Sequence, residues 1–371
     1  MTTPSLLQKS YENSVMFNLS RLELARKRCR YTSKILAEKS GIAPVTLSRV
    51  VNGKQAPDDE TKRRLIAALG FPEKFYEKDD ADEIDAGSAS FRSLSGMTAR
   101  ERDASLSAGS LAFEIADWLN KTYQLPNPDL PNLDYEIDAS SAAQTVRQYW
   151  GIGEKPIGNL IMTLEAKGVR IFSLSETTKN VDAYSLWRND EPFIFLNTFK
   201  SAERSRFDAA HELGHLILHR HGGPAHRSAE TEANTFASAF LMPVNDVKTR
   251  LPFVSSLQMI IAEKKRWRVS AAALCYRLHK LGILSEWQNR TFNIQLNQRY
   301  GTTEPNGIER ETSGVWKMVF EDLWQQRKTR AIIADELSLP ESELDNLVFG
   351  LASQKSIEPI QQEKIGLRLV K

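Results

Sequence analysis

Residues 206–219, RFDAAHELGHLILH, contain the pattern H-E-x-x-H inside an apolar segment. On a helix, positions i and i+4 lie on one face about one turn apart, so His211 and His215 can bind one ion. Imidazole nitrogens bind Zn²⁺ at ~2.0–2.1 Å. Glu212 follows the first ligand and can take a proton from a zinc-bound water as general base. The apolar flanks predict a buried helix, in which an ionisable trio is costly unless it is paired or metallated.

A third protein ligand is needed, and four residues downstream are candidates. His219 is two turns from His211, ~12 Å along a helix, and His221 faces away if the helix continues. His226 follows the loop Gly222-Gly-Pro224 and stays an alternative. Glu230 on the next helix is favoured, because a His₂Glu set with one open position is the catalytic form of zinc. We expect the other three histidines to be surface or loop residues.

The charge of the chain is unevenly distributed. The 371 residues carry 49 Lys and Arg against 47 Asp and Glu, a net charge of +2 that by itself argues against nucleic-acid binding. Residues 1–78, however, hold 15 basic and 8 acidic side chains, a net charge of +7. An acidic run at 79–85 and a small-residue stretch at 86–90 then predict an exposed linker. The length suggests two or three domains.

Short helices with tight turns are predicted in the basic module. Residues 36–54, LAEKSGIAPVTLSRVVNGK, place a helix, a turn at Gly41 and a second helix that starts at Pro44. This arrangement can put one helix into a major groove. The segment resembles the Cro/repressor-like helix-turn-helix family over about residues 18–76.

That resemblance implies a five-helix DNA-binding domain that acts as a homodimer on a palindromic operator. It places Pro44, Val45 and Arg49 against bases, where Arg49 can pair with guanine and Val45 can touch a thymine methyl group. It assigns phosphate contacts to Ser33, Asn52 and Lys54, although the family often has Gln where this chain has Ser33.

A second resemblance covers about residues 100–290. The 206–219 segment, followed by ETEANTFASAFLMP at 230–243, resembles the ImmA/IrrE family of metallopeptidases, which have a zincin-like core. The resemblance implies Zn²⁺ as cofactor, Glu212 as catalytic base, and His211, His215 and Glu230 as metal ligands. It also implies that Asn234 orients a ligand, and Asn197 matches a family position that can equally be a strand-end turn. Two residues, His226 and Tyr184, are candidates for the group that stabilises the oxyanion.

The remaining patterns predict a mainly α chain with a small β-sheet. A capping box at Thr98–Glu101 opens a long helix, and further helices are expected at 141–150, 156–167 and 228–241. Strands are expected at 169–174, 184–187 and 192–196. Residues 331–351 look like a helix-turn-helix but are acidic, which favours packing or partner binding over DNA. The predicted units are an HTH domain (1–78), a linker (79–97), a zincin-like domain (98–290) and a helical region (291–371).

These features together predict a transcriptional regulator with a zinc endopeptidase domain. The resemblance implies that it cleaves a repressor-type protein to switch stress, mobile-element or phage-defence genes. The alternatives are a metabolite-sensing transcription factor without proteolysis and an antitoxin or controller of a defence operon. No apolar run approaches ~18–20 residues, no signal peptide is visible, and two distant cysteines suit a reducing compartment. We therefore expect a cytoplasmic protein without a membrane partner.

Overall fold

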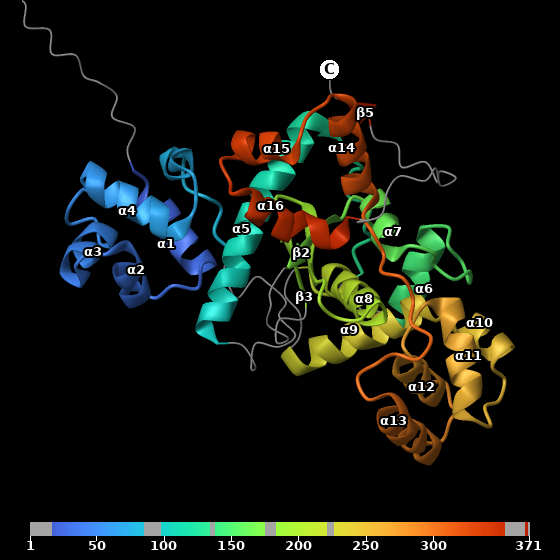
Figure 1. Cartoon of the computed structure of the whole chain (residues 1–371). Helices are drawn as coiled ribbons and strands as arrows, with labels where there is room; N and C mark the ends of the chain where they lie inside the picture. Colours follow the sequence, from blue (N-terminus) through green and yellow to red (C-terminus); the bar gives the residue numbers. More distant parts are fainter. Residues whose placement is uncertain are drawn as a thin grey trace, which may run out of the picture.

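The structure is a computed structural model that describes residues 17–84, 98–133, 138–174, 183–220, 226–352 and 368–369. Figure 1 shows the N-terminal helices at one side, a small sheet near the middle and a lobe of helices from residues 244–300 on the other side. The expected fold class, mainly helical with a small sheet, is confirmed. Within the described part of the chain, no helix is long and apolar enough to cross a membrane.

Within its described residues, from 17 onward, the N-terminal domain has four α-helices followed by one short 3₁₀ helix, which takes the place of the fifth expected helix there. Thr32 caps α2, where its Oγ1 accepts from the Ile35 N–H at 3.2 Å. Gly41 ends α2 with φ of +65°, a conformation that favours glycine. The elements are α1 (Leu19–Arg28), α2 (Ser33–Ser40), α3 (Pro44–Val51), α4 (Asp59–Leu69) and η1 (Glu73–Glu77).

A three-stranded sheet confirms the predicted strands. It has the order β2-β4-β3, in which β4 is parallel to β2 and antiparallel to β3. Asn189 and Asp190 take φ of +49° and +61° in the two-residue turn between β3 and β4. The strands are β2 (Arg170–Leu174), β3 (Ala183–Arg188) and β4 (Glu191–Asn197).

Alternating side chains of the sheet pack into two different hydrophobic cores. Phe193 and Phe195 of β4 pack on one face, whereas Ile194 and Leu196 pack on the other. The first face is shared with α5 (Ala99–Thr122) and with the C-terminal helices α14 (Gly314–Gln325), α15 (Arg330–Leu337) and α16 (Glu341–Val348), followed by η2 (Phe349–Leu351). Beside them, the short strand β1 (Tyr123–Gln124) pairs with β5 (Arg368–Leu369).

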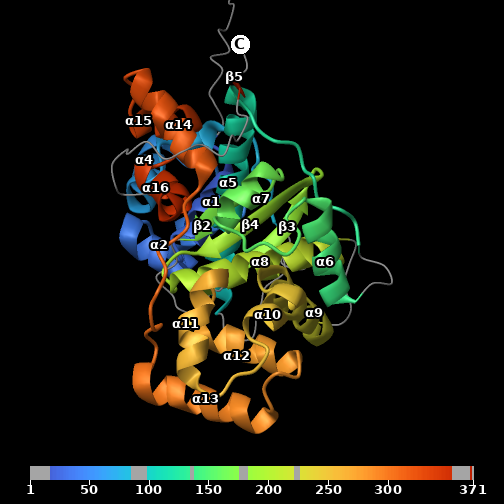
Figure 2. The same ribbon diagram turned by 90° about the vertical axis from the view of Figure 1, so that its right-hand side faces the viewer.

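The other face of the sheet is covered by the helix that carries the H-E-x-x-H pattern. Figure 2 shows α8 (Ala202–Leu218) beneath the strands, with α9 (His226–Leu241) and the α10–α13 lobe further out. The last helix of that lobe crosses position 290, so the expected boundary there falls inside a helix. The other elements of this half are α6 (Ala139–Tyr149), α7 (Leu160–Ala166), α10 (Val244–Arg250), α11 (Leu257–Trp267), α12 (Ala271–Lys280) and α13 (Glu286–Tyr300).

The N-terminal domain lies directly against the rest of the chain. One continuous apolar core joins its helices to α5, the sheet and α14–α16. The expected exposed linker is described only up to residue 84, and that part is anchored. Arg21 donates from Nε to the Asp79 carbonyl oxygen at 2.7 Å, and Arg188 donates from Nε to Asp82 at 2.7 Å. Residues 85–97 lie outside the described part.

Candidate metal centre

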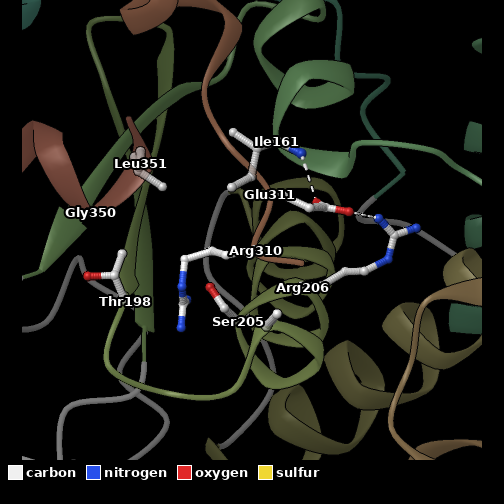
Figure 3. A pocket seen from close by; sticks show the side chains of 9 residues that line it. Ile161, Thr198, Ser205, Arg206, Arg310, Glu311, Gly350 and Leu351 are labelled. Carbon is white, nitrogen blue, oxygen red and sulfur yellow. Dashed lines mark hydrogen bonds and ion pairs between the residues drawn. The ribbon is translucent and has the colours of Figure 1, made fainter. Parts of the chain in front are cut away.

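Helix α8 is fixed at its N-terminal half by a buried arginine. Arg206 pairs with Glu311 and donates to the carbonyl oxygens of Ile157 and Gly158 at 2.7 and 3.1 Å. Glu311 also accepts from the backbone N–H of Leu160 at 2.9 Å. Figure 3 shows this pair beside a cavity of about 10 Å³, which holds at most one water. These contacts tie the helix to the start of α7.

Helices α8 and α9 pack closely because α8 has glycine at their contact. A Cβ built on Gly214 would lie 3.2 Å from the Ala233 Cα and 3.2 Å from a Phe236 ring carbon. His219 near the end of α8 contacts Glu232 near the start of α9, so the two helices run antiparallel. This packing brings Glu230 over the face of α8 that carries the histidines.

Three donor atoms meet at this face. The Nε2 atoms of His211 and His215 are 3.1 Å apart, and each lies 3.3 Å from one carboxylate oxygen of Glu230. Ligands of a tetrahedral Zn²⁺ with bonds of ~2.0–2.1 Å are separated by about 3.3 Å. The three residues therefore fit a zinc ion, and within the described residues they form a group suited to a metal.

The Glu230 carboxylate is held in its anionic form. Burial works to raise its pKa, but hydrogen bonds and charge from His211 and His215 outweigh burial and bring that pKa well below its ordinary value. Its side chain keeps 23% exposure, whereas those of His211 and His215 keep 1% and 7%. The solvent side of the centre is therefore at Glu230.

Asn234 lies one turn after Glu230 and contacts the first histidine. Its Oδ1 is 3.1 Å from the Nδ1 of His211, so it can accept a hydrogen bond that orients the imidazole. Asn197 ends β4, and its Oδ1 accepts from the Phe199 N–H at 2.9 Å. That contact is typical of a strand-end turn, one of the two interpretations of Asn197.

His219 is not the surface or loop residue that we expected. It caps the C-terminus of α8 with a side chain only 7% exposed. Its Nδ1 lies 3.0 Å from the Nδ1 of His215, and its Nε2 lies 3.1 Å from Glu232. Burial lowers its pKa, and nearby His215 lowers it further against the opposing effect of Glu232. The spacing of four residues from His215 was the signal in the sequence.

Sequence reasoning missed Ser185, which contacts Glu212. Ser185 lies on β3, and its Oγ donates to the Glu212 Oε2 at 2.7 Å. Both residues are buried, at 3% and 1% exposure. The bond orients the Glu212 carboxylate. A serine in an apolar strand was the only sequence feature that distinguished it.

The three remaining candidates lie away from the donor set or fall where the structure gives no side-chain description. Tyr184 is fully buried in the core shared with α5, where its hydroxyl donates to the Ser105 carbonyl oxygen at 2.9 Å. Burial also raises its pKa. Because its hydroxyl is engaged by Ser105 within the core, Tyr184 is placed as a packing residue. His226 begins α9 but its side chain is not described, and His221 lies outside the described residues.

The expected DNA contacts are all on the surface. Helix α3 buries Leu47 and Val50 and exposes the opposite side, where Val45 is 65% exposed. The exposed side chains at the expected contact positions are Ser33, Pro44, Val45, Arg49, Asn52 and Lys54. Asn52 donates to the Ser48 carbonyl oxygen at 2.7 Å, which holds it at the end of the helix.

Two protein-family models match the chain. The model for the IrrE N-terminal-like domain, a peptidase family, matches residues 164–279, and the helix-turn-helix model matches residues 22–75. A comparison with curated proteins found no match. The polypeptide thus combines a helix-turn-helix domain with a metallopeptidase-like IrrE domain, and both resemblances in the sequence are confirmed. The first match includes the whole donor set of the candidate metal centre.

Proposed function

We propose that this protein is a DNA-binding regulator whose IrrE-like domain is a zinc-dependent endopeptidase. Its substrate would be a repressor-type protein, cleaved to switch stress, mobile-element or phage-defence genes. The main support is the spacing of 3.1–3.3 Å between the donor atoms of His211, His215 and Glu230. Two imidazoles and one carboxylate are the ligand set of catalytic rather than structural zinc.

Glu212 is the proposed general base. When bound, zinc acts as a Lewis acid that acidifies water and polarises a peptide carbonyl. Glu212 would accept the proton of the attacking water and deliver it to the leaving amine. Ser185 holds the Glu212 Oε2 by its hydrogen bond, so the carboxylate needs little rearrangement before the proton transfer.

The variant Glu212→Gln tests this proposal. We expect zinc content to stay at the wild-type level, because Glu212 is not in the donor set, and cleavage to fall about 10²–10⁴-fold with the loss of the base. Protein fragments in cells that express wild type or variant would be compared by mass spectrometry under DNA damage or phage infection. Glu263→Gln, which removes a carboxylate from α11, is the control. Identical fragments in wild-type and Glu212→Gln cells would refute the peptidase.

DNA binding is tested separately at α3. We expect Arg49→Ala to weaken binding to a duplex selected from a random pool by about 1–3 kcal/mol and to relax the preference at one base pair. Lys54→Ala should weaken binding to all duplexes by a similar factor. It should also lower the slope of log affinity against log salt concentration by about 1, the release of one counterion. Fluorescence anisotropy at several salt concentrations measures both. Half-site spacing in the selected DNA tests whether the chain acts as the homodimer that the helix-turn-helix resemblance implies.

Sensing without cleavage is the alternative. The cavities beside Arg206 and beside Arg170 have volumes of about 10 Å³ each, room for one water and not for an acyl ligand. If Glu212→Gln leaves the cellular output intact while Arg49→Ala removes it, the regulator acts through DNA alone. A sensor or an operon controller would then replace the peptidase.

A further inference from the structure

We propose that His219 and Glu232 form a hydrogen-bond relay that holds His215 as a metal ligand. The inference rests on the proposed metal centre and adds two positioning residues to it. Neither residue is in the donor set itself. The relay runs from the centre along the contact between α8 and α9 and ends on a carboxylate.

The first bond follows from the protonation of a ligand histidine. The His215 Nε2 faces the other two donors, so it is the nitrogen that would bind the metal. A neutral imidazole bound through Nε2 carries its hydrogen on Nδ1. That Nδ1 lies 3.0 Å from the Nδ1 of His219. Two ring nitrogens at this distance share one hydrogen, so His215 donates and His219 accepts.

The second bond follows from the first. Because His219 accepts at Nδ1, its own hydrogen is on Nε2, which lies 3.1 Å from the Glu232 Oε2. The other oxygen of Glu232 accepts from the Ser228 Oγ at 3.0 Å, which holds the carboxylate in place. A carboxylate at the end of such a chain makes the ligand imidazole a stronger base and fixes its orientation.

The two ligand histidines therefore have different supports. His211 faces the neutral amide of Asn234, whereas His215 is connected through His219 to a negative charge. The His219 side chain is 7% exposed, so little water competes for its bonds. We infer that the affinity of the centre for zinc depends on the relay at His215.

Zinc affinity of the full-length chain tests the relay without any substrate. Competition with a chromophoric chelator should show 10–100-fold weaker binding for His219→Ala, the usual effect of losing such a partner. His219→Gln should recover most of the affinity, because its amide can accept from His215 and donate to Glu232. Glu263→Gln, which removes one carboxylate from α11 as Glu232→Ala removes one from α9, should bind zinc like wild type.

A second variant covers the case in which His219→Ala does not fold. Glu232 is 40% exposed, so Glu232→Ala should leave the fold intact and weaken zinc binding several-fold. The absorption bands of the Co²⁺-loaded chain should shift in both Ala variants, because the His215 ring is less constrained. The relay is wrong if either folded Ala variant binds zinc within twofold of wild type. If wild type itself binds no zinc, the metal centre fails and the relay fails with it.

Discussion

Glu212, His211 and His215 each have a hydrogen-bond partner from a different position in the chain. Ser185 comes from a strand, Asn234 from the next helix, and His219 from the end of the same helix. Such partners fix the rotamers of residues that must act at one point in space. At the residue scale, the candidate centre is therefore a set of oriented side chains rather than a motif alone.

A buried acid elsewhere makes a prediction at the same scale. Glu165 accepts from the backbone N–H groups of Gly314 and Val315 at 2.7 and 3.3 Å and from the hydroxyl of Ser313. Burial raises its pKa from 4.5 to about 7, although these hydrogen bonds act in the opposite direction. The folded chain therefore binds this proton more tightly than the unfolded chain, and its contribution to stability is fully present below about pH 4.5.

We expect this contribution to fall by roughly 3 kcal/mol as the pH rises from about 4.5 to 7. Glu165→Gln removes the titration, so the free energy of unfolding of the variant should depend less on pH across that window. Urea unfolding at pH 5 and pH 8 measures the difference between the two chains. Parallel pH profiles for wild type and variant would contradict the prediction.

At the element scale, α5 is the helix that joins the halves of the molecule. Its capping box at Thr98 and Glu101 forms as the sequence predicts. One side of it packs on α1 of the N-terminal domain, and another packs on the sheet. Gly109 lies at the closest approach, where an added Cβ would be 2.6 Å from the Tyr184 hydroxyl and 2.4 Å from an Ile84 methyl group.

We expect Gly109→Ala to destabilise the protein by about 1–3 kcal/mol through overpacking. Alanine gains up to about 1 kcal/mol of helix propensity, but Tyr184 is buried and bonded to Ser105 and cannot move aside. Gly158→Ala is the control, because nothing lies within 4 Å of its added Cβ. Thermal unfolding of both variants is the measurement. An equal melting temperature for both would contradict the close packing.

At the scale of the whole molecule, partly buried ion pairs hold the DNA-binding domain on the rest of the chain. Arg21 and Lys78 both pair with Glu114 of α5. Arg28 at the end of α1 donates from Nε to Glu343 of α16 at 2.7 Å, and these two side chains are 7% and 14% exposed. The acidic C-terminal helices thus contact the basic domain, which agrees with the expectation that they serve packing or partner binding.

We expect Arg28→Glu to lower the free energy of unfolding by up to about 3–5 kcal/mol, because it leaves the largely buried Glu343 beside a like charge. The double variant Arg28→Glu with Glu343→Arg, which reverses both charges, should recover most of the lost free energy of unfolding. Arg63→Glu breaks an exposed pair with Glu60 and should cost less than about 1 kcal/mol. Chemical unfolding compares the three. A double variant no more stable than Arg28→Glu would show that the pair does not hold the interface.

Local features of this protein follow from short stretches of sequence. The H-E-x-x-H spacing places His211 and His215 together because a helix repeats every 3.6 residues. The turn at Gly41 and the capping box of Thr98 also form between close neighbours in sequence. The two domain types, the strands and the likeness to IrrE were therefore predicted correctly from the residues.

The residues alone indicated several helices and all three strands of the central sheet, because propensity, capping and periodicity act over a few positions. They also favoured a candidate donor set. Three contacts were decided only by the packing of the folded chain. Glu232 meets His219 across 13 positions of sequence, and Ser185 meets Glu212 across 27. Arg28 meets Glu343 across 315 positions. Packing also places Tyr184, a candidate oxyanion donor in the sequence, in the core shared with α5. Such contacts depend on how helices and sheet pack, since packing brings together side chains whose distance in sequence carries no signal.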